Sequence, residues 1–274
     1  MAAENVIGGR RAREAELLSV HGFMALADLA GQVGVSESTA RRDLEILEQQ
    51  GLVRRIHGGA VWAGQKFAFA EREMTAATEK QAIADAVAGL IPENQTIILD
   101  GGTTCREIAR AIAGRRISVV TNSVPIASLL SQQPQTEVTL VGGYVYPRTG
   151  VALGATAVEQ LEHLHATQLV MSCAGVTEEG TFNANQMMVD VERKMMAIAD
   201  EVVLAVDHTK FGMRAVVKLC GLDEVNVIVS DSGVDAGRRK WLQSLAARVV
   251  FADVTEVRQP RWRARNLGRA PAGP

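Results

Sequence analysis

The segment SESTARRDLEIL, from Ser36 to Leu47, has the residue pattern of an amphipathic helix. Ser36 is a favourable N-cap residue, and Glu37 places a negative charge in the first turn, where the helix dipole stabilises it. The expected buried stripe consists of Ala40, Leu44 and Leu47. The opposite face of the helix is therefore free to contact another molecule.

The outward face near the start of this helix combines short hydroxyl side chains with arginines, namely Ser38, Thr39, Arg41 and Arg42, followed by Glu45. Arginine can form two hydrogen bonds with guanine, a hydroxyl can reach a base edge or a phosphate, and a helix N-terminus favours phosphate. These properties suit a helix that lies in the major groove of DNA. An ordinary surface helix with a solvated charged face would show the same residues, so the segment alone leaves both interpretations open.

The segments on either side favour DNA binding. Residues 10–21 predict one helix, residues 26–33 carry apolar side chains at helical spacing, and a turn at Gly34 leads directly to Ser36, which together indicate a helix-turn-helix. Downstream, Gly51 is expected to end the helix, and residues 52–61 contain short β-prone pieces around a glycine pair, typical of a wing. The expected DNA contacts are Ser36, Ser38, Thr39, Arg41 and Arg42 on the helix, and Arg54, Arg55 and His57 on the wing.

The overall charge gives no general support for nucleic-acid binding. The 274 residues carry a formal net charge of −2, with 47% hydrophobic and 22% charged residues, an ordinary globular composition. Residues 1–64 hold seven arginines and eight acidic residues. Because DNA affinity depends on neutralising phosphates, any basic surface must be local.

The cysteines and the first residues point to the cytoplasm. Cys105, Cys173 and Cys220 show no C-x-x-C spacing, so we expect buried thiols in a reducing compartment, with no disulfide framework and no metal site. The sequence shows no signal-peptide h-region and no apolar run approaching the ~18 residues of a membrane span.

Beyond the wing the pattern changes to alternating strands and helices. Short apolar runs are expected as strands at residues 96–99, 117–121, 138–141, 169–172, 202–206, 227–230 and 249–251, and helices at residues 79–90, 105–113, 155–164, 191–199 and 237–245. Such alternation predicts a mainly parallel sheet covered on both faces. We therefore expect a DNA-binding domain at residues 8–64, a linker at 65–77, an α/β domain at 78–254 and a disordered tail at 258–274 that is rich in arginine and proline.

Glycine and small polar residues follow the predicted strands. The first of these strands runs into Asp100-Gly101-Gly102-Thr103-Thr104, and later strands end at Thr121-Asn122-Ser123, Gly142-Gly143, Ala174-Gly175 and Asp207-His208-Thr209-Lys210. In a parallel α/β sheet ligands bind where strands end and helices begin, and glycine N–H groups, hydroxyls and a helix start can hold an anion. One shared cleft with Lys210 near Asp100 would suit a phosphorylated polyol or sugar.

Both halves resemble the DeoR-type bacterial transcriptional regulators. The segments that carry the resemblance are STARRDLEILEQQGLVRRIHGGAV in the first half and ILDGGTT, VVTNS, LVGG and VDHTKFG in the second. The resemblance covers roughly residues 10–252. It implies a winged helix-turn-helix joined to a sensor domain similar in fold to ribose-5-phosphate isomerase and the CoA transferases, which generally senses a phosphorylated sugar.

Because the resemblance implies a fold similar to that of ribose-5-phosphate isomerase, an enzyme is the alternative function. The isomerases carry a D-G-A-D-E segment, whereas the corresponding stretch here is Ser172-Cys173-Ala174-Gly175-Val176, without either aspartate. Glu192 best matches the catalytic glutamate, and residues 181–185, including Asn183, replace the glycine-rich turn. Proton transfer needs a positioned base with charge-stabilising partners, so we expect no isomerase activity and no cofactor.

The resulting hypothesis is a repressor of carbohydrate-metabolism genes that binds double-stranded operator DNA as a homo-oligomer, dimer or tetramer, and releases it when a phosphorylated sugar binds. The residues expected to bind this effector are Asp100, Gly101, Gly102, Thr103, Thr104, Asn122, Ser123, Gly142, Gly143, Gly175, Asn183, Glu192, Asp207 and Lys210.

Overall fold

The computed structural model describes residues 2–21, 23–49, 52–56, 58–62 and 75–254. They divide into two compact units. One contains the described residues up to Thr75 together with Tyr144–Ala152, and the other contains Ala76–Gly143 and the described residues from Leu153 onward. The expected tail at 258–274 and most of the expected linker at 65–77 lie outside the described residues.

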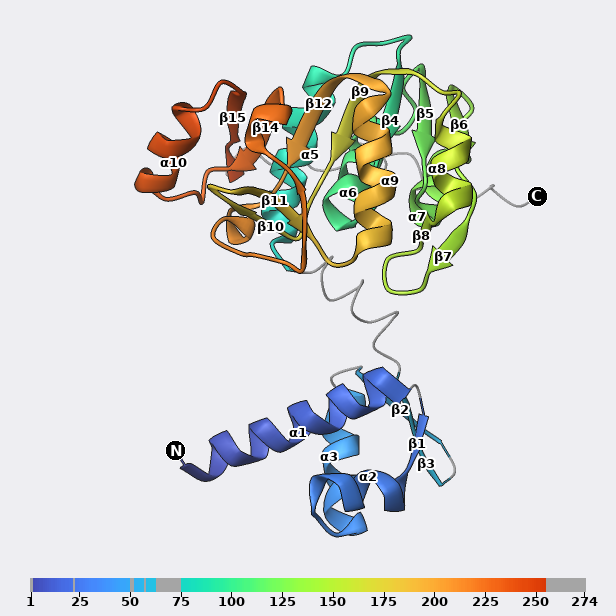
Figure 1. Ribbon diagram of the computed structural model, residues 1–274, viewed down its shortest axis with the longest axis vertical. Helices are drawn as coiled ribbons and strands as arrows, with labels where there is room; N and C mark the ends of the chain where they lie inside the picture. The colour runs from blue at the N-terminus through green and yellow to red at the C-terminus, as the bar shows by residue number, and fades with distance from the viewer. Residues whose placement is uncertain (1, 22, 50–51, 57, 63–74, 255–274) are drawn as a thin grey trace, which may run out of the picture. The chain divides into compact units, whose positions relative to one another are not determined.

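The N-terminal unit is a helix-turn-helix followed by a small antiparallel sheet (Figure 1). Its elements are α1 (Ala2–His21), β1 (Phe23–Ala25), α2 (Leu26–Val33), α3 (Glu37–Gln49), β2 (Val53–Ile56) and β3 (Gly59–Trp62). The strands lie in the order β1-β3-β2. The wing predicted from the sequence is therefore confirmed as the β2–β3 hairpin, to which β1 adds a third strand.

Local chemistry explains the sharp turn between α2 and α3. Gly34 ends α2 in the left-handed conformation, with φ +69°, which glycine adopts without strain. Ser36 then caps α3, because its Oγ accepts a hydrogen bond from the Thr39 backbone N–H at 3.3 Å. The predicted stripe of α3 is buried, and its Leu44 and Leu47 belong to a core that α1, α2 and the sheet also line, formed by Leu17, Leu18, Met24, Leu29, Leu44, Leu47, Val53 and Ala60.

The second unit is built on a seven-stranded parallel sheet with the order β15-β14-β12-β9-β4-β5-β6. The strands are β4 (Thr96–Leu99), β5 (Ile117–Thr121), β6 (Thr136–Leu140), β9 (Ala166–Met171), β12 (Ala199–Ala205), β14 (Val227–Asp231) and β15 (Arg248–Ala252). All of the predicted strands are present, and the central position of β4, between β9 and β5, places the residues after Leu99 in the middle of one sheet edge.

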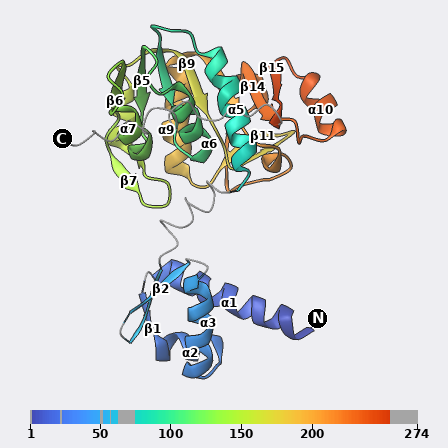
Figure 2. The ribbon, with the colours of Figure 1, turned by 180° about the vertical axis from the view of Figure 1, so that it is seen from behind.

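Helices cover both faces of this sheet. Figure 1 shows α8 and α9 on one face, and Figure 2 shows α5, α6 and α7 on the other. The helices are α5 (Ala77–Leu90), α6 (Thr103–Ile112), α7 (Val124–Leu130), α8 (Ala155–Leu161), α9 (Gln186–Ala197) and α10 (Ala236–Gln243). Side chains of α5, α6 and α7, such as Ile83, Ile108 and Ile126, pack with Ile97 and Val119 of the sheet in one hydrophobic core.

Several short elements were not predicted. They are α7, the β7 (Tyr144–Tyr146) and β8 (Val151–Leu153) ribbon, an antiparallel sheet of β10 (Gly175–Thr177), β11 (Gly180–Asn183) and β13 (Val217–Cys220), and the 3-10 turns η1 (His208–Lys210) and η2 (Leu222–Glu224). Helix α9 also begins at Gln186, five residues before the predicted start at Val191. Asn185 explains this start, because its Oδ1 accepts a hydrogen bond from the Met188 N–H at 3.0 Å.

None of the described helices combines the length and the apolar character that a membrane span requires.

Candidate DNA interface and effector site

The outer face of α3 presents the groups expected to contact DNA. The side chains of Ser38, Arg41 and Arg42 are exposed, and Thr39 is half-buried. The Ser36 Oγ lies 2.9 Å from both the Ser38 Oγ and the Thr39 Oγ1, so the hydroxyls form one cluster at the start of the helix. Within the described part of the chain Arg41 and Arg42 form no ion pair, which leaves both guanidinium groups available to a duplex.

A buried acidic residue fixes α3 to α1. Asp43 accepts a hydrogen bond from the Arg10 Nε at 2.6 Å, and the Arg11 Nε lies 3.5 Å from its other oxygen. Glu14, one turn further along α1, is fully buried, and neither of its oxygens has a hydrogen-bond partner among the described residues. Burial, and to a lesser extent the charge of Asp43, raises the pKa of Glu14 to about 7.

Two of the three predicted wing residues, Arg54 and Arg55, lie on β2. The third, His57, is outside the described residues. Arg55 is bound to the recognition helix α3: its Nε lies 2.7 Å from the Glu48 Oε2 and its Nη1 lies 2.7 Å from the Glu45 Oε1. In this structure the Arg55 side chain is therefore bound to two carboxylates of its own chain. Its contact with DNA phosphate stays a prediction.

The ends of the parallel strands bring many of the predicted effector residues to one edge of the sheet. Asp100, Gly101 and Gly102 follow β4 and lead into Thr103 and Thr104 at the start of α6, Asn122 and Ser123 follow β5, and Asp207 follows β12. Asp100 is 5% exposed, and burial raises its pKa to about 7, although the backbone N–H groups of Gly101 and Ser172 donate to its carboxylate. Gly102, with φ +109°, begins α6 with open space beside its Cα.

Asp100 and Glu192 of α9 are two buried carboxyl groups that interact electrostatically. Glu192 is 3% exposed, and burial together with the charge of Asp100 raises its pKa well above the ordinary value. The Asn183 Nδ2 donates to the Glu192 Oε1 at 2.6 Å, and the Ala174 N–H donates to the Asn183 Oδ1 at 3.0 Å. The Glu192 Oε2 is buried without a partner in the described residues. A carboxyl oxygen left open in this way can form a hydrogen bond with a ligand hydroxyl.

Other predicted effector residues already have structural roles. The Gly142 N–H donates to the Gln160 Oε1 at 2.8 Å. A Cβ on Gly143 or Gly175 would lie 2.6 Å or 2.3 Å from a backbone oxygen, so close packing requires glycine at both positions. Asp207 caps η1 by accepting from the Thr209 N–H at 3.1 Å, and Ser123 caps α7. Lys210 lies half-buried on η1, and its proximity to Asp100 stays a prediction.

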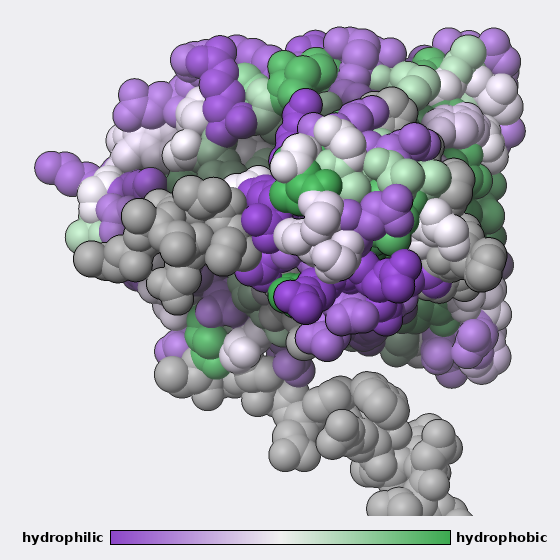
Figure 3. All heavy atoms as spheres, turned by 90° about the horizontal axis from the view of Figure 1, so that it is seen from below, coloured by the Kyte–Doolittle hydropathy of each residue, from purple (hydrophilic) through white to green (hydrophobic). Residues whose placement is uncertain are grey.

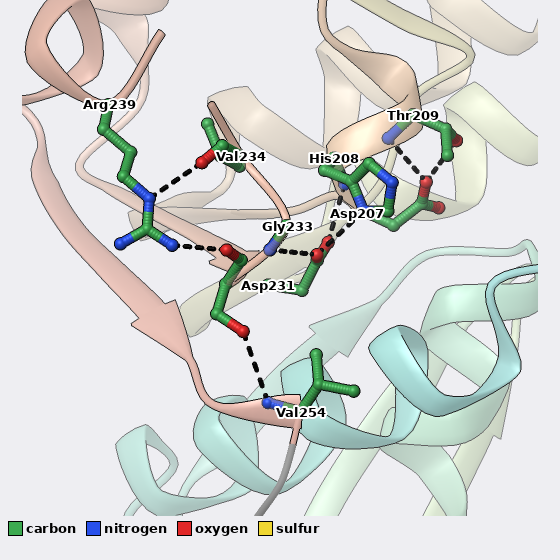
Figure 4. A network of polar contacts seen from close by, with 9 residues as sticks. Asp207, His208, Thr209, Asp231, Gly233, Val234, Arg239 and Val254 are labelled. Carbon is green, nitrogen blue, oxygen red and sulfur yellow. Dashed lines mark hydrogen bonds and ion pairs between the residues drawn. The ribbon is translucent and has the colours of Figure 1, made fainter. Parts of the chain in front are cut away.

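A polar network that the sequence did not reveal holds the loop carrying Lys210 (Figure 4). The buried carboxylate of Asp231, at the end of β14, accepts from the His208 N–H at 2.7 Å and from the Gly233 N–H at 2.8 Å, and its Oδ2 lies 2.8 Å from the His208 Nδ1. A Cβ on Gly233 would approach the His208 Nδ1 to 2.7 Å, so glycine makes room for the ring. His208 is thus turned toward β14, and it anchors the loop.

A buried lysine on α5 was also overlooked. Lys80 is 3% exposed although it lies on a helix whose apolar stripe includes Ile83, Ala84 and Val87. Its spacing of three, four and seven residues from that stripe predicts that it lies on the buried face of the helix.

The surface of the protein is mixed in character. On the face drawn in Figure 3, small hydrophobic patches lie between hydrophilic residues.

A helix-turn-helix with an exposed arginine pair, joined to a parallel α/β domain with polar strand ends, defines the class of protein as a DNA-binding transcriptional regulator. Residues 10–66 match the family described as DeoR-like helix-turn-helix domain, and residues 75–232 match the DeoR C terminal sensor domain. The chain belongs to the DeoR family.

Curated relatives match this chain in sequence over most of their lengths. The HTH-type transcriptional repressor CsqR of Escherichia coli (strain K12) is 33% identical, covering 86% of this chain and 92% of that one. The HTH-type transcriptional regulator GlpR of Haloferax volcanii is 32% identical over 88% and 96%. The glycerol-3-phosphate regulon repressor of Escherichia coli (strain K12) is 28% identical over 79% and 88%. These relatives are transcriptional regulators, which assigns the chain to regulation and not to enzymatic catalysis.

Among solved structures, ribose 5 phosphate isomerase A from Neisseria gonorrhoeae aligns with a TM-score of 0.37 and 16% identity over 49% of this chain and 53% of that one.

Proposed function

We propose that this protein represses carbohydrate-metabolism genes, and that a phosphorylated sugar bound at the strand ends of the α/β domain releases it from operator DNA. The observation that carries the proposal is that Asp100, which leads into the glycines Gly101 and Gly102, and Glu192, which has a carboxyl oxygen without a partner in the described residues, are both buried and interact electrostatically. The two carboxyl groups can exchange hydrogen bonds with sugar hydroxyls, while the glycine turn and the α6 N-terminus offer N–H groups to an anion. That combination matches the two ends of a sugar phosphate.

The protein would act in the cytoplasm as a dimer or a tetramer, presenting two recognition helices to half-sites of a roughly palindromic operator. Effector and DNA would then weaken each other's binding by the same factor, with a coupling free energy of roughly 1–3 kcal/mol. The mechanism uses no cofactor and no metal. The relative named glycerol-3-phosphate regulon repressor supports an effector of this chemical class.

The decisive experiment measures binding of the full chain to DNA flanking its own gene while sugar phosphates and their dephosphorylated counterparts are added one at a time. We expect release by at least one phosphorylated compound and no release by its dephosphorylated form. Asp100→Asn and Glu192→Gln should abolish the response and leave DNA affinity unchanged. Asp190→Asn, on the exposed face of α9, is the matched control and should respond normally. A panel in which no anionic metabolite shifts DNA binding would overturn the proposal.

A further inference from the structure

Arg55 ties the wing to the recognition helix through both its backbone and its side chain. Its N–H donates to the Glu48 Oε1 at 2.8 Å, its Nε donates to the Glu48 Oε2 at 2.7 Å, and its Nη1 donates to the Glu45 Oε1 at 2.7 Å. One carboxylate therefore receives two hydrogen bonds from one residue, which fixes the strand as well as the side chain. The Arg55 backbone N–H, followed by its side chain, lowers the pKa of Glu48, as expected for a carboxylate that must be charged to bind in this way.

The two carboxylates sit on a surface where a free negative charge would oppose DNA. Glu45 follows Arg41 by four residues and Arg42 by three, so all three side chains share the outward face of α3. A nearby phosphate backbone would repel an unpaired glutamate there. The arginine that neutralises both glutamates comes from the wing strand β2, so the same contact sets the position of β2 against α3.

We propose that Arg55 is a positioning residue for DNA binding and not a phosphate contact: it holds the wing against the recognition helix and neutralises Glu45 and Glu48. The Nε–H and one Nη1 N–H are bound to the carboxylates, so a phosphate that approached the remaining N–H groups would come close to two negative charges. Arg55 then contributes to DNA affinity through its contact with Glu45 and Glu48. We call this three-residue contact the wing latch. Base and phosphate recognition is left to Arg41, Arg42 and the hydroxyl cluster.

A double-mutant cycle distinguishes the two roles. The probe is a DNA duplex selected by the wild-type full chain from a random-sequence library, and the readout is the dissociation constant at several salt concentrations. Arg55→Gln in the wild type should weaken binding by roughly three- to tenfold, as expected for loss of exposed ion pairs. In the Glu45→Gln, Glu48→Gln background the same change should cost less than about twofold, because the latch is already absent. The slope of log affinity against log salt should be the same with and without Arg55.

A phosphate contact gives the opposite results. Arg55→Gln would then cost as much or more in the carboxylate-free background, because the freed arginine reaches phosphate more readily, and the salt slope would fall by about one. Either result overturns the proposal, as does an Arg55→Gln variant with wild-type affinity. The charge effect of removing the glutamates cancels in the cycle, so it does not confuse the comparison.

Two further variants serve as controls. Arg13→Gln removes the same charge from the same unit and breaks an exposed pair with Glu16, of 2.7 Å, that does not involve α3; it should change affinity by less than about twofold. Should Arg55→Gln fail to fold, as judged by circular dichroism, Arg55→Lys takes its place. Lysine keeps the charge but not the planar fork, so it should weaken a latch and preserve a phosphate contact.

Discussion

Replacing Glu14 by glutamine should stabilise the protein at pH 8 and change its stability little at pH 5. Glu14 is fully buried in the N-terminal unit, and its pKa of about 7 compares with an ordinary value of 4.5. The folded state therefore holds the proton more tightly than the unfolded state. The contribution of this proton to stability is complete below about pH 4.5 and is lost as the pH rises through about 7.

The magnitude follows from the separation of the two pKa values. The two pKa values differ by about 2.5, and each pKa unit corresponds to ~1.36 kcal/mol. The unfolding free energy should therefore change by at most roughly 3 kcal/mol between pH 4 and pH 8. Glutamine has nearly the same shape and does not titrate, so Glu14→Gln should remove most of that pH dependence. Local rearrangement of the nearby Arg10 and Arg11 would reduce the measured effect to about 1–3 kcal/mol.

Urea unfolding followed by circular dichroism, at pH values from 5 to 8, measures this difference between variant and wild type. The matched control is Glu16→Gln, two residues along the same helix, where the carboxylate is 61% exposed and bound to Arg13. Its effect should stay within about 0.5 kcal/mol at every pH. If the unfolding free energies of Glu14→Gln and the wild type depend on pH in the same way, or if the variant is less stable at pH 8, then Glu14 is not a buried carboxyl with a raised pKa.

Three other outcomes follow from the site. Arg41→Ala or Arg42→Ala should lose roughly 1–3 kcal/mol of operator affinity if the residue reads a base, measured by fluorescence anisotropy; unchanged affinity in both would reject the recognition-helix assignment. Lys210→Ala should keep wild-type DNA affinity and lose the response to the effector in the same assay, and a normal response would remove Lys210 from the site. Gly175→Ala should destabilise the α/β domain by about 1–3 kcal/mol in thermal unfolding, because its Cβ would lie 2.3 Å from the Met213 oxygen; a neutral effect would mean that the loop yields.

The main elements were predictable because their signals are local. Buried parallel strands appear as uninterrupted apolar runs, as in residues 96–99, and helices as apolar residues at a spacing of three and four. The missed elements lack such runs: β10 has three residues, and α7 carries Pro125 in its first turn, a position that proline favours but that resembles a break in the sequence. The early start of α9 depends on one cap, Asn185.

The contacts of individual site residues were less predictable, because they join residues that are far apart in the sequence. Asp100 was recognised from its place after a strand, which is a local property. Its electrostatic interaction with Glu192 relates the end of β4 to α9, and the contact of His208 with Asp231 spans 23 positions. Arg55 shows the same limit: its charge suggested a phosphate contact, and only the fold shows that two glutamates already bind it.

The charge balance of residues 1–64, with eight acidic residues against seven arginines, seemed to argue against DNA binding. The structure removes that objection by where it places the charges. Asp43 and Glu14 are buried, and Glu45 and Glu48 are bound by Arg55, so these four acids do not act as free surface charges. Arg41 and Arg42 stay unpaired among the described residues, on the face of α3 that also carries the hydroxyl cluster. DNA responds to the field at that surface and not to a sum over the unit, so a domain with a net negative charge can still present Arg41 and Arg42 to phosphate.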